Sequence, residues 1–267
     1  MSTASPAAMP PAPAAEGLTH RQILTILSGL MTGMFLAALD QNIVGTAIKT
    51  IADELHGLSA QAWVTTAYLI TSTIATPLYG KLSDIYGRKK FFMAAITIFI
   101  IGSAMCSFAA SMYQLAAFRA VQGIGAGGLF SLALAIIGDI VPPRERAKYQ
   151  GYFLAVFGTS SVLGPIIGGF FAGADSILGI TGWRWVFLVN VPVGLVALLI
   201  VARTLHVSHF ARPSAIDWWG AFTLVVGVVP LLLVAEQGRE WGWTSPSSLT
   251  AYAIGLVGLI AFVWVET

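Results

Sequence analysis

The chain has 267 residues, of which 57% are hydrophobic and only 10% are charged. Ordinary soluble domains are about 45–50% apolar and about 25% charged, and so apolar a surface would not stay in water. The composition excludes a soluble globular protein and predicts an integral membrane protein. The net charge of +2 comes from scattered basic residues, which excludes nucleic acid as a partner.

The chain begins with a segment rich in alanine, proline and serine. Residues 1–20 have no apolar periodicity, so we expect a disordered tail. No basic stretch followed by an apolar one is present there, so the sequence predicts no cleaved signal peptide.

Apolar runs of about twenty residues follow, each long enough to cross roughly 30 Å of hydrocarbon. Open sheets cannot span lipid and these runs are too long for barrel strands, so the sequence predicts an all-α integral membrane protein. The predicted spans are residues 22–47, 61–80, 91–110, 113–137, 149–172, 184–203, 217–235 and 248–265.

The distribution of basic residues predicts the orientation of these spans. With the N-terminus in the cytoplasm, ten of the 14 basic residues lie inside, three lie outside, and Arg119 falls within a span. Cytoplasmic loops are the ones enriched in Lys and Arg, so we expect a cytoplasmic N-terminus. All eight tryptophans fall near predicted span ends, where such rings anchor at the interface.

Two ionisable residues fall inside predicted spans. Asp40 lies in the first span and Arg119 in the fourth, and both lie roughly 9–10 Å below the outer surface at 1.5 Å per residue. An unpaired charge there costs several kcal/mol. We expect the pair to form an ion or proton site; the alternatives are a static salt bridge and an aspartate wetted at the interface. The four histidines lie in tails or loops, which leaves Asp40 as the expected proton carrier.

The loop between the second and third predicted spans has the sequence GKLSDIYGRKK at residues 80–90. This loop resembles the signature between the second and third helices of the major facilitator superfamily. The resemblance implies a charge-relay latch with an acidic residue at the inner end of the fourth helix. The residues that match this latch motif are Gly80, Asp84, Gly87, Arg88, Lys89 and Asp139.

Three further motifs resemble the fourteen-span drug:proton antiporter branch of that superfamily. Residues 39–47 (LDQNIVGTA) resemble its first-helix motif, although Asn42 stands where Thr is more usual. Arg119, Gln122, Gly123 and Gly125 resemble the fourth-helix motif, whose Arg is implicated in proton coupling. The antiporter motif of the fifth helix is matched by Gly151, Ser160 (in place of Gly), Gly164, Pro165, Gly168 and Gly169.

Residues 182–194 (GWRWVFLVNVPVG) also resemble this branch. For Arg184 and the neighbouring tryptophans we expect anchoring at the outer interface. Cys106 is expected to serve packing. The chain has no phosphate-binding Gly-x-x-x-x-Gly-Lys-Ser/Thr loop, no zinc-ligand cluster and no catalytic triad with positional support, so we expect no enzyme, metal or cofactor, with protons as the coupling ion.

The resemblance implies three regions: a tail (residues 1–20), a six-helix N-terminal transporter domain (21–203), and a cytoplasmic linker with two extra helices (204–267). It also implies an absent C-terminal six-helix half. We expect the N-terminal part of a proton-coupled multidrug exporter of the plasma (inner) membrane, with amphipathic drugs, the bilayer and that second half as partners. The alternatives are a non-transporting membrane sensor or assembly protein on the same scaffold, and an uptake permease of the superfamily.

Overall fold

The computed structural model describes residues 19–205 and 217–267. The predicted tail up to residue 18 and the central part of the linker, with His206, His209 and Arg212, lie outside the described residues. Most predicted span ends lie within three residues of the helix ends, but the first, second and seventh helices continue to Glu54, Tyr86 and Trp241, past predicted ends at 47, 80 and 235. The long helices are α1 (His20–Glu54), α2 (Gln61–Tyr86), α3 (Arg88–Ser107), α4 (Met112–Ile140), α5 (Arg146–Ala172), α7 (Asn190–Thr204), α8 (Trp218–Trp241) and α9 (Pro246–Glu266).

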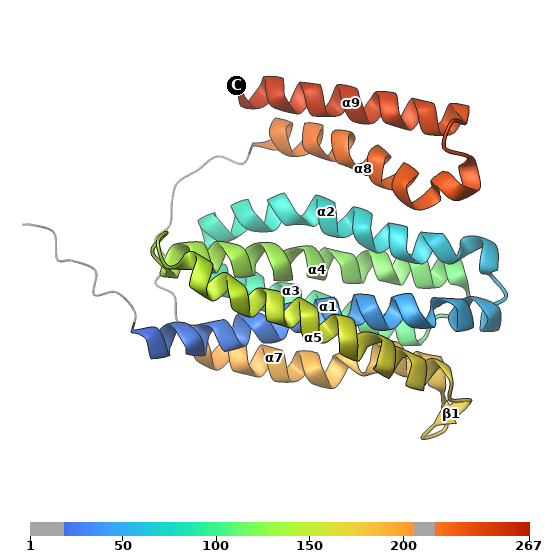
Figure 1. The fold of residues 1–267 in the computed structure, drawn as a ribbon, viewed down its shortest axis with the longest axis horizontal. Coiled ribbons are helices and arrows are strands. Elements are labelled where there is room, and N and C mark those ends of the chain that lie inside the picture. The colour runs from blue at the N-terminus through green and yellow to red at the C-terminus, as the bar shows by residue number, and fades with distance from the viewer. Residues whose placement is uncertain (1–18, 206–216) are drawn as a thin grey trace, which may run out of the picture.

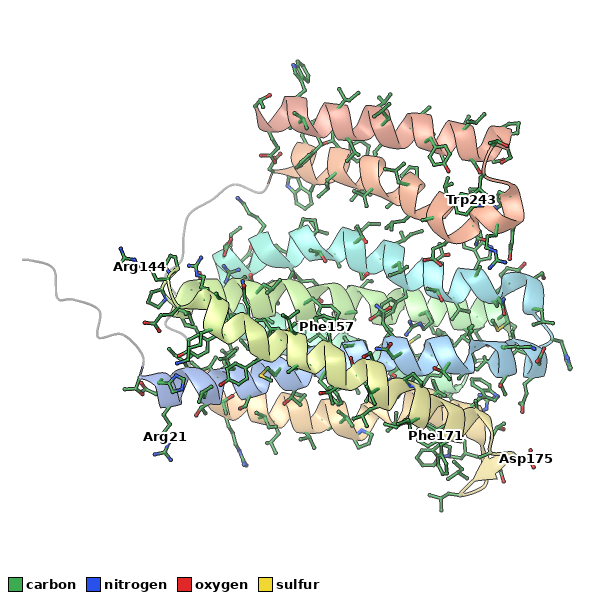
Figure 2. The ribbon with its side chains drawn as sticks, in the orientation of Figure 1. Arg21, Arg144, Phe157, Phe171, Asp175 and Trp243 are labelled. Carbon is green, nitrogen blue, oxygen red and sulfur yellow. The ribbon has the colours of Figure 1, made fainter. Side chains whose placement is uncertain are left out.

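The helices run roughly parallel or antiparallel to one another as a bundle (Figure 1). α4 packs against α2 and α3, α1 packs against α5, and α7 lies against α1 and α3. α8 and α9 pair with each other, and α8 contacts α2. Arg21 and Arg144 extend from the end of the bundle at which α1 begins, whereas Asp175 lies at the opposite end (Figure 2). The all-α membrane fold predicted from composition is confirmed.

Two clusters of buried apolar side chains hold the six-helix part together. The larger one joins α1, α2, α3, α4, α5 and α7, with Leu30, Phe99 and Leu129 among its fully buried members. The smaller one lies toward the end where α1 finishes and includes Ile43 and Phe187. The polar network described below lies where these two clusters meet, since Asp40 lies on α1 between Ala37 of the larger cluster and Ile43 of the smaller one.

The second predicted span forms a helix but is less apolar than the others. Seven helical segments in the described ranges are long and apolar enough to cross a membrane, and α2 is not one of them. The physical reason is its run of hydroxyl side chains. Thr66, Ser72 and Thr76 each donate to a carbonyl of the preceding helical turn, and α2 packs between α4 and α8.

The sixth predicted span, residues 184–203, is confirmed as one apolar segment over Gly182–Thr204, but its helical hydrogen bonding has one break. A 3-10 turn η2 (Gly182–Arg184) leads into α6 (Trp185–Leu188), and α7 starts at Asn190. The carbonyl of Leu188 would normally accept from the amide four residues later, but that residue is Pro192, which has no N–H. The break therefore follows from the sequence, although the span pattern did not reveal it.

A short hairpin precedes this broken span. β1 (Ser176–Ile177) pairs antiparallel with β2 (Ile180–Thr181), so strand structure is present where the sequence predicted none. Leu178 and Gly179 have φ values of 53° and 77°, as a two-residue hairpin turn requires at both central positions. A 3-10 turn η1 (Leu58–Ala60) joins α1 to α2.

The expected interfacial role is wrong for Trp183, which is only 2% exposed. Its indole N–H donates to Glu54 at 3.1 Å, and the Arg184 guanidinium lies 4.5 Å from its ring centroid. Arg184 also donates to the carbonyls of Ser107 and Ala109 in the α3–α4 connection. These two side chains fasten the start of the sixth span to α1 and α3 instead of facing lipid.

Candidate functional site

Asp40 and Arg119 meet in the interior of the bundle. Arg119 Nη1 lies 2.5 Å from Asp40 Oδ2, and the side chains are 2% and 0% exposed. α1 and α4 run in opposite directions, which places a residue late in α1 level with a residue early in α4. The sequence predicted that these two ionisable residues lie at the same depth, and in the structure they are in contact.

Three polar side chains complete the surroundings of this ion pair. Gln122 Nε2 donates to Asp40 Oδ1 at 3.0 Å, and Asn190 Nδ2 donates to the same oxygen at 2.6 Å. Both amides also donate to Ser103 Oγ, at 3.1 and 3.0 Å, and the Ser103 hydroxyl donates to the carbonyl of Phe187. All three side chains are at most 1% exposed, so a single buried network joins α1, α3, α4, α6 and α7.

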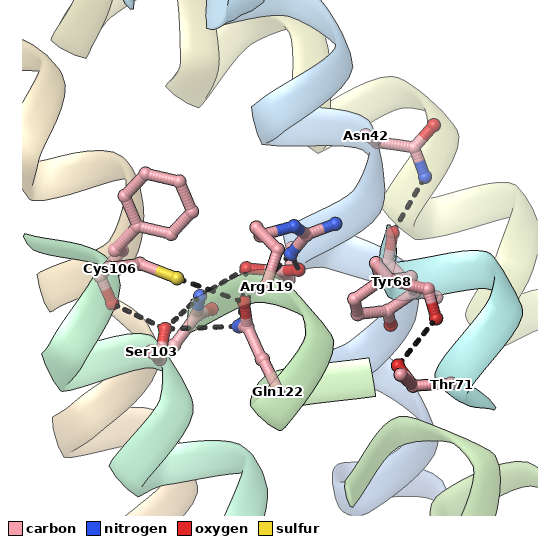
Figure 3. Close-up of polar contacts among 11 residues, drawn as sticks. Asn42, Tyr68, Thr71, Ser103, Cys106, Arg119 and Gln122 are labelled. Carbon is pink, nitrogen blue, oxygen red and sulfur yellow. Dashed lines mark hydrogen bonds and ion pairs between the residues drawn. The ribbon is translucent and has the colours of Figure 1, made fainter. Parts of the chain in front are cut away.

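The other face of the network is closed by Cys106 and Tyr68. The Cys106 thiol donates to Gln122 Oε1 at 3.8 Å, and Arg119 Nη1 donates to the same oxygen at 2.8 Å. The Tyr68 ring lies 4.0 Å from the centre of the Arg119 guanidinium, a cation–π contact. Figure 3 shows these side chains turned toward one another from α2, α3 and α4.

The Asp40 carboxylate accepts hydrogen bonds from three side chains, those of Arg119, Gln122 and Asn190. Around it, Arg119 Nε and Asn190 Oδ1 have no hydrogen-bond partner within the described ranges. Buried ion pairs contribute little to stability compared with apolar packing, and ionisable side chains inside membrane spans often mark functional sites. No group of three His, Cys, Asp or Glu side chains among residues 19–205 and 217–267 could hold a metal ion.

Glycines of α4 bring its backbone close enough to build this network. A Cβ on Gly123 would lie 2.4 Å from the carbonyl oxygen of Tyr68, and one on Gly125 would lie 2.6 Å from that of Ala95. Both distances are shorter than any side chain tolerates, so only glycine allows α2 and α3 to approach α4 so closely. These two glycines of the fourth-helix motif therefore pack α4 against α2 on one face and α3 on another.

The latch motif is assembled at the end of the bundle where α1 begins. Arg88, the first residue of α3, pairs with Asp84 of α2 at 2.5 Å and with Asp139 of α4 at 2.9 Å. Its guanidinium also donates to Ser83 Oγ at 2.6 Å and to the Gly80 carbonyl at 3.2 Å. The residues expected to form the latch are therefore in direct contact, and Arg88 links three helices.

The remaining residues of the latch motif have distinct positions. Gly87 joins α2 to α3 with a φ of 107°, which favours glycine. A Cβ on Gly80 would meet nothing within 4 Å, so its carbonyl, not its size, connects it to Arg88. Lys89, the remaining residue of the latch motif, donates to the Ala202 carbonyl at 2.6 Å and so caps the last turn of α7.

The antiporter motif divides into a packed face and an open face of α5. A Cβ on Gly164 would lie 2.2 Å from Asn42 Cβ, and one on Gly168 would lie 2.8 Å from the Ile43 carbonyl oxygen. Ser160 is fully buried and donates to a carbonyl of its own helix. A Cβ on Gly151 or Gly169 would meet nothing within 4 Å. Pro165 lies inside α5, which stays helical through it.

Sequence reasoning missed two members of the buried network. Ser103 was unremarked, and Asn190 was noted only as part of a motif at the start of the sixth span. A signal existed, because each is a hydrogen-bonding side chain within an apolar run, and such groups are buried only with partners. Cys106 does pack in the interior as predicted, but it also contacts the network.

Comparison with known proteins identifies the family. The profile of the Major Facilitator Superfamily matches residues 30–267. The chain belongs to this superfamily. The multidrug transporter protein MdtP of Bacillus subtilis is 42% identical over 253 residues, covering 94% of this chain and 46% of the relative. Multidrug resistance protein 3 of the same organism is 43% identical over 242 residues, covering 90% and 46%. The chain thus spans about half the length of the curated relatives it matches.

Solved structures support the fold. A proton:xylose symporter of the superfamily aligns with a TM-score of 0.61 at 16% identity, covering 93% of this chain and 53% of that one. A bacterial homologue of the human lysosomal transporter Spinster aligns with a TM-score of 0.59 at 18% identity, covering 92% and 61%. At these identities the likeness concerns the arrangement of helices alone.

Proposed function

We propose that the chain is the N-terminal part of a proton-coupled multidrug exporter of the fourteen-span drug:proton antiporter branch. In this proposal the protein exchanges inward-moving protons for outward-moving amphipathic drugs by alternating access, and it uses no cofactor. The observation that carries the proposal is the fully buried carboxylate of Asp40, paired with Arg119 and enclosed by polar side chains from several helices. The names of the two Bacillus subtilis relatives support drugs as the substrate class.

The chemistry of the site fits proton coupling. A proton on Asp40 would neutralise the carboxylate and release the Arg119 guanidinium from its only ionic partner in the described part of the chain. Arg119 would then be a buried, unpaired cation, which a low-dielectric interior strongly disfavours. Protonation therefore gives the bundle a reason to change conformation, as an exchange cycle requires.

The other motifs have roles in the same cycle. The Arg88 contacts to Asp84 and Asp139 would hold one end of the bundle closed in one conformation, and the Gly164–Gly169 stretch of α5 would form the interface between halves. A second six-helix half, in the same or another chain, would supply the other wall of the transport path, because alternating access rocks one half against the other. We place residues 21–203 in the transporter domain and 204–267 in the linker with two extra helices. The proposed location is the plasma (inner) membrane, with the N-terminus in the cytoplasm.

The test is ethidium efflux from cells that lack their own exporters and express the whole reading frame encoding this chain. We expect Asp40→Asn to reduce efflux driven by a proton gradient to the level of cells without the protein. The matched control is Asp53→Asn, an exposed carboxyl near the end of the same helix, which should keep wild-type efflux. Wild-type efflux in the Asp40→Asn variant would remove Asp40 from coupling.

Uptake is the second candidate function. A vacuolar membrane amino acid uptake transporter of Schizosaccharomyces pombe is 38% identical over 250 residues, covering 90% of this chain and 42% of the relative. The site chemistry serves uptake as well as export, because the same proton exchange can drive either. Direction of flux in sealed vesicles, measured with labelled amino acids and with ethidium, separates the two.

A further inference from the structure

The two amides that donate to Asp40 Oδ1 differ in how firmly they are held. Gln122 Oε1 accepts from Arg119 Nη1 and from the Cys106 thiol, so both ends of the Gln122 amide are bonded. Asn190 donates from Nδ2 to Asp40 and Ser103, but its Oδ1 is buried with no partner among the described residues. Only the Asn190 amide is therefore free to exchange its two ends.

A protonated Asp40 needs an acceptor that the observed arrangement does not offer at Oδ1. Both neighbours of that oxygen are N–H donors, and an O–H group placed between two donors has nothing to bond. A half-turn of the terminal Asn190 torsion would bring its carbonyl oxygen to Asp40, and such sp³–sp² torsions have two comparable settings. The uptake of one proton onto Oδ1 breaks no covalent bond.

We propose that Asn190 is a two-state amide that reports the protonation of Asp40 to the break in the sixth span. This inference rests on the proposed function only for its use in transport. With Asp40 ionised, Asn190 donates to it, as observed. With Asp40 protonated, the Asn190 side-chain amide turns, and its oxygen accepts a hydrogen bond from the Asp40 O–H group. Asn190 is a positioning residue in this scheme, because it acts through Asp40.

The position of Asn190 connects this turn to the backbone. It is the first residue of α7 and lies two positions after Leu188, the last residue of α6, whose carbonyl has no amide partner because the residue four positions later is Pro192. Turning the amide removes the Asn190 donor from Ser103 Oγ and presents an acceptor to the same hydroxyl. The Ser103 hydroxyl, which donates to the Phe187 carbonyl in α6, can then donate to Asn190 Oδ1 instead. Protonation of Asp40 would thus alter a hydrogen bond on each side of the break.

Few other titratable or charged groups near Asp40 could transmit its protonation to the sixth span. The titratable groups that interact electrostatically with Asp40 are Arg119 on α4, Tyr68 on α2 and Cys106 on α3. Residues 149–172 of α5 and 190–202 of α7 contain no Asp, Glu, Lys, Arg or His. The sixth span can therefore sense a proton on Asp40 only through a neutral polar side chain, and Asn190 is the one in contact.

The composition of the chain gives a direct spectroscopic test. Asn42 and Asn190 are the asparagines of these 267 residues, so ¹³C on the asparagine side-chain carbonyls of this segment alone reports two groups. The purified whole protein, with this segment labelled and any remainder of the protein unlabelled, is compared at low and high pH by infrared difference spectroscopy. We expect the low-pH spectrum to gain a carboxylic acid band together with a shift of one asparagine carbonyl band. Asn42, whose amide donates to the Ala38 carbonyl on its own helix, is the unshifted internal reference.

Variants assign the two signals. Asp40→Ser should remove the Asp40 component of the new carboxylic acid absorption and abolish the asparagine shift. Asn190→Leu should abolish the asparagine shift and keep the carboxylic acid band, whereas Gln237→Leu, which removes a fully buried amide outside the network, should keep both. An asparagine shift that survives in Asp40→Ser, or a wild-type spectrum in which the Asp40 band appears without any asparagine shift, would overturn the inference.

The spectrum also separates this inference from the proposed function. The infrared measurement requires no transport, so failure of Asp40→Asn to affect efflux leaves it standing. Conversely, an asparagine carbonyl band that is the same in wild type and Asp40→Ser overturns the role of Asn190, even where efflux depends on Asp40. The wild-type and Asp40→Ser comparison decides the matter even where Asn190→Leu does not fold.

Discussion

Removal of one partner of the buried ion pair should destabilise the bundle far more than removal of both. Arg119→Met leaves Asp40 Oδ2 without its donor and takes away a second hydrogen bond to Gln122. Because the remaining carboxylate is fully buried, we expect a loss of about 3–5 kcal/mol in the free energy of unfolding. Asp40→Asn leaves Arg119 charged but with a neutral acceptor, and the loss of a charged hydrogen bond predicts about 1.5–3 kcal/mol.

The double variant tests whether these losses share one cause. With both charges removed, the interior holds an amide and an apolar side chain in place of an ion pair, and such replacements are often close to neutral. We expect the loss of unfolding free energy in Asp40→Asn with Arg119→Met to be smaller than the sum of the single losses by at least about 2 kcal/mol. The charge network, rather than the volume of the arginine, is then the source of the effect.

The assay measures the free energy of unfolding in mixed micelles by tryptophan fluorescence, as the mole fraction of a denaturing detergent is raised. Arg144→Met is the matched control, because Arg144 is exposed at the end of the bundle (Figure 2), and it should stay within about 0.5 kcal/mol of wild type. Losses that simply add in the double variant, or an Arg119→Met loss no larger than that of the control, would refute the coupled buried pair.

Three further predictions concern the latch, helix packing and an unpartnered amide. Arg88→Ala should lower the free energy of unfolding by about 1 kcal/mol or less per lost ion pair, since both partners are over a third solvent-exposed; an equal loss at low and high salt would contradict this. Gly123→Val should prevent folded expression, measured by size-exclusion profile, because its Cβ would lie 2.4 Å from a backbone carbonyl oxygen of α2, whereas Gly151→Ala should be neutral or gain about 0.5–1 kcal/mol. Gln237→Leu should leave the thermal midpoint unchanged or raise it, because neither polar atom of Gln237 is bonded; a lowered midpoint would mean that the amide has a partner.

The sequence was sufficient to predict which residues meet at the core of the site. Asp40 and Arg119 are the ionisable residues inside predicted spans, and a count of residues along two antiparallel helices placed them at one depth. The contact at 2.5 Å agrees with that reasoning. The latch contacts followed from the resemblance of residues 80–90, and Arg88 does bridge Asp84 and Asp139.

Other features depended on geometry that a linear pattern does not carry. Ser103 and Asn190 are ordinary polar residues in apolar runs, and only the crossing of α3 and α7 beside α1 brings them to Asp40. The motif match of Lys89 gave no sign that its ammonium donates to a carbonyl of α7. Trp183 lies at a span end, where an interfacial position is the usual outcome, but a partner on α1 buries it.

The central claim is that Asp40 carries the proton that is exchanged for drug. It is tested most directly by adding ethidium to the purified whole protein in weakly buffered detergent solution and recording the pH. An exporter that exchanges the two ligands at a linked site should release protons when the drug binds, and the Asp40→Asn variant should release none while Asp53→Asn releases as many as wild type. Proton release of wild-type size from Asp40→Asn would contradict the account.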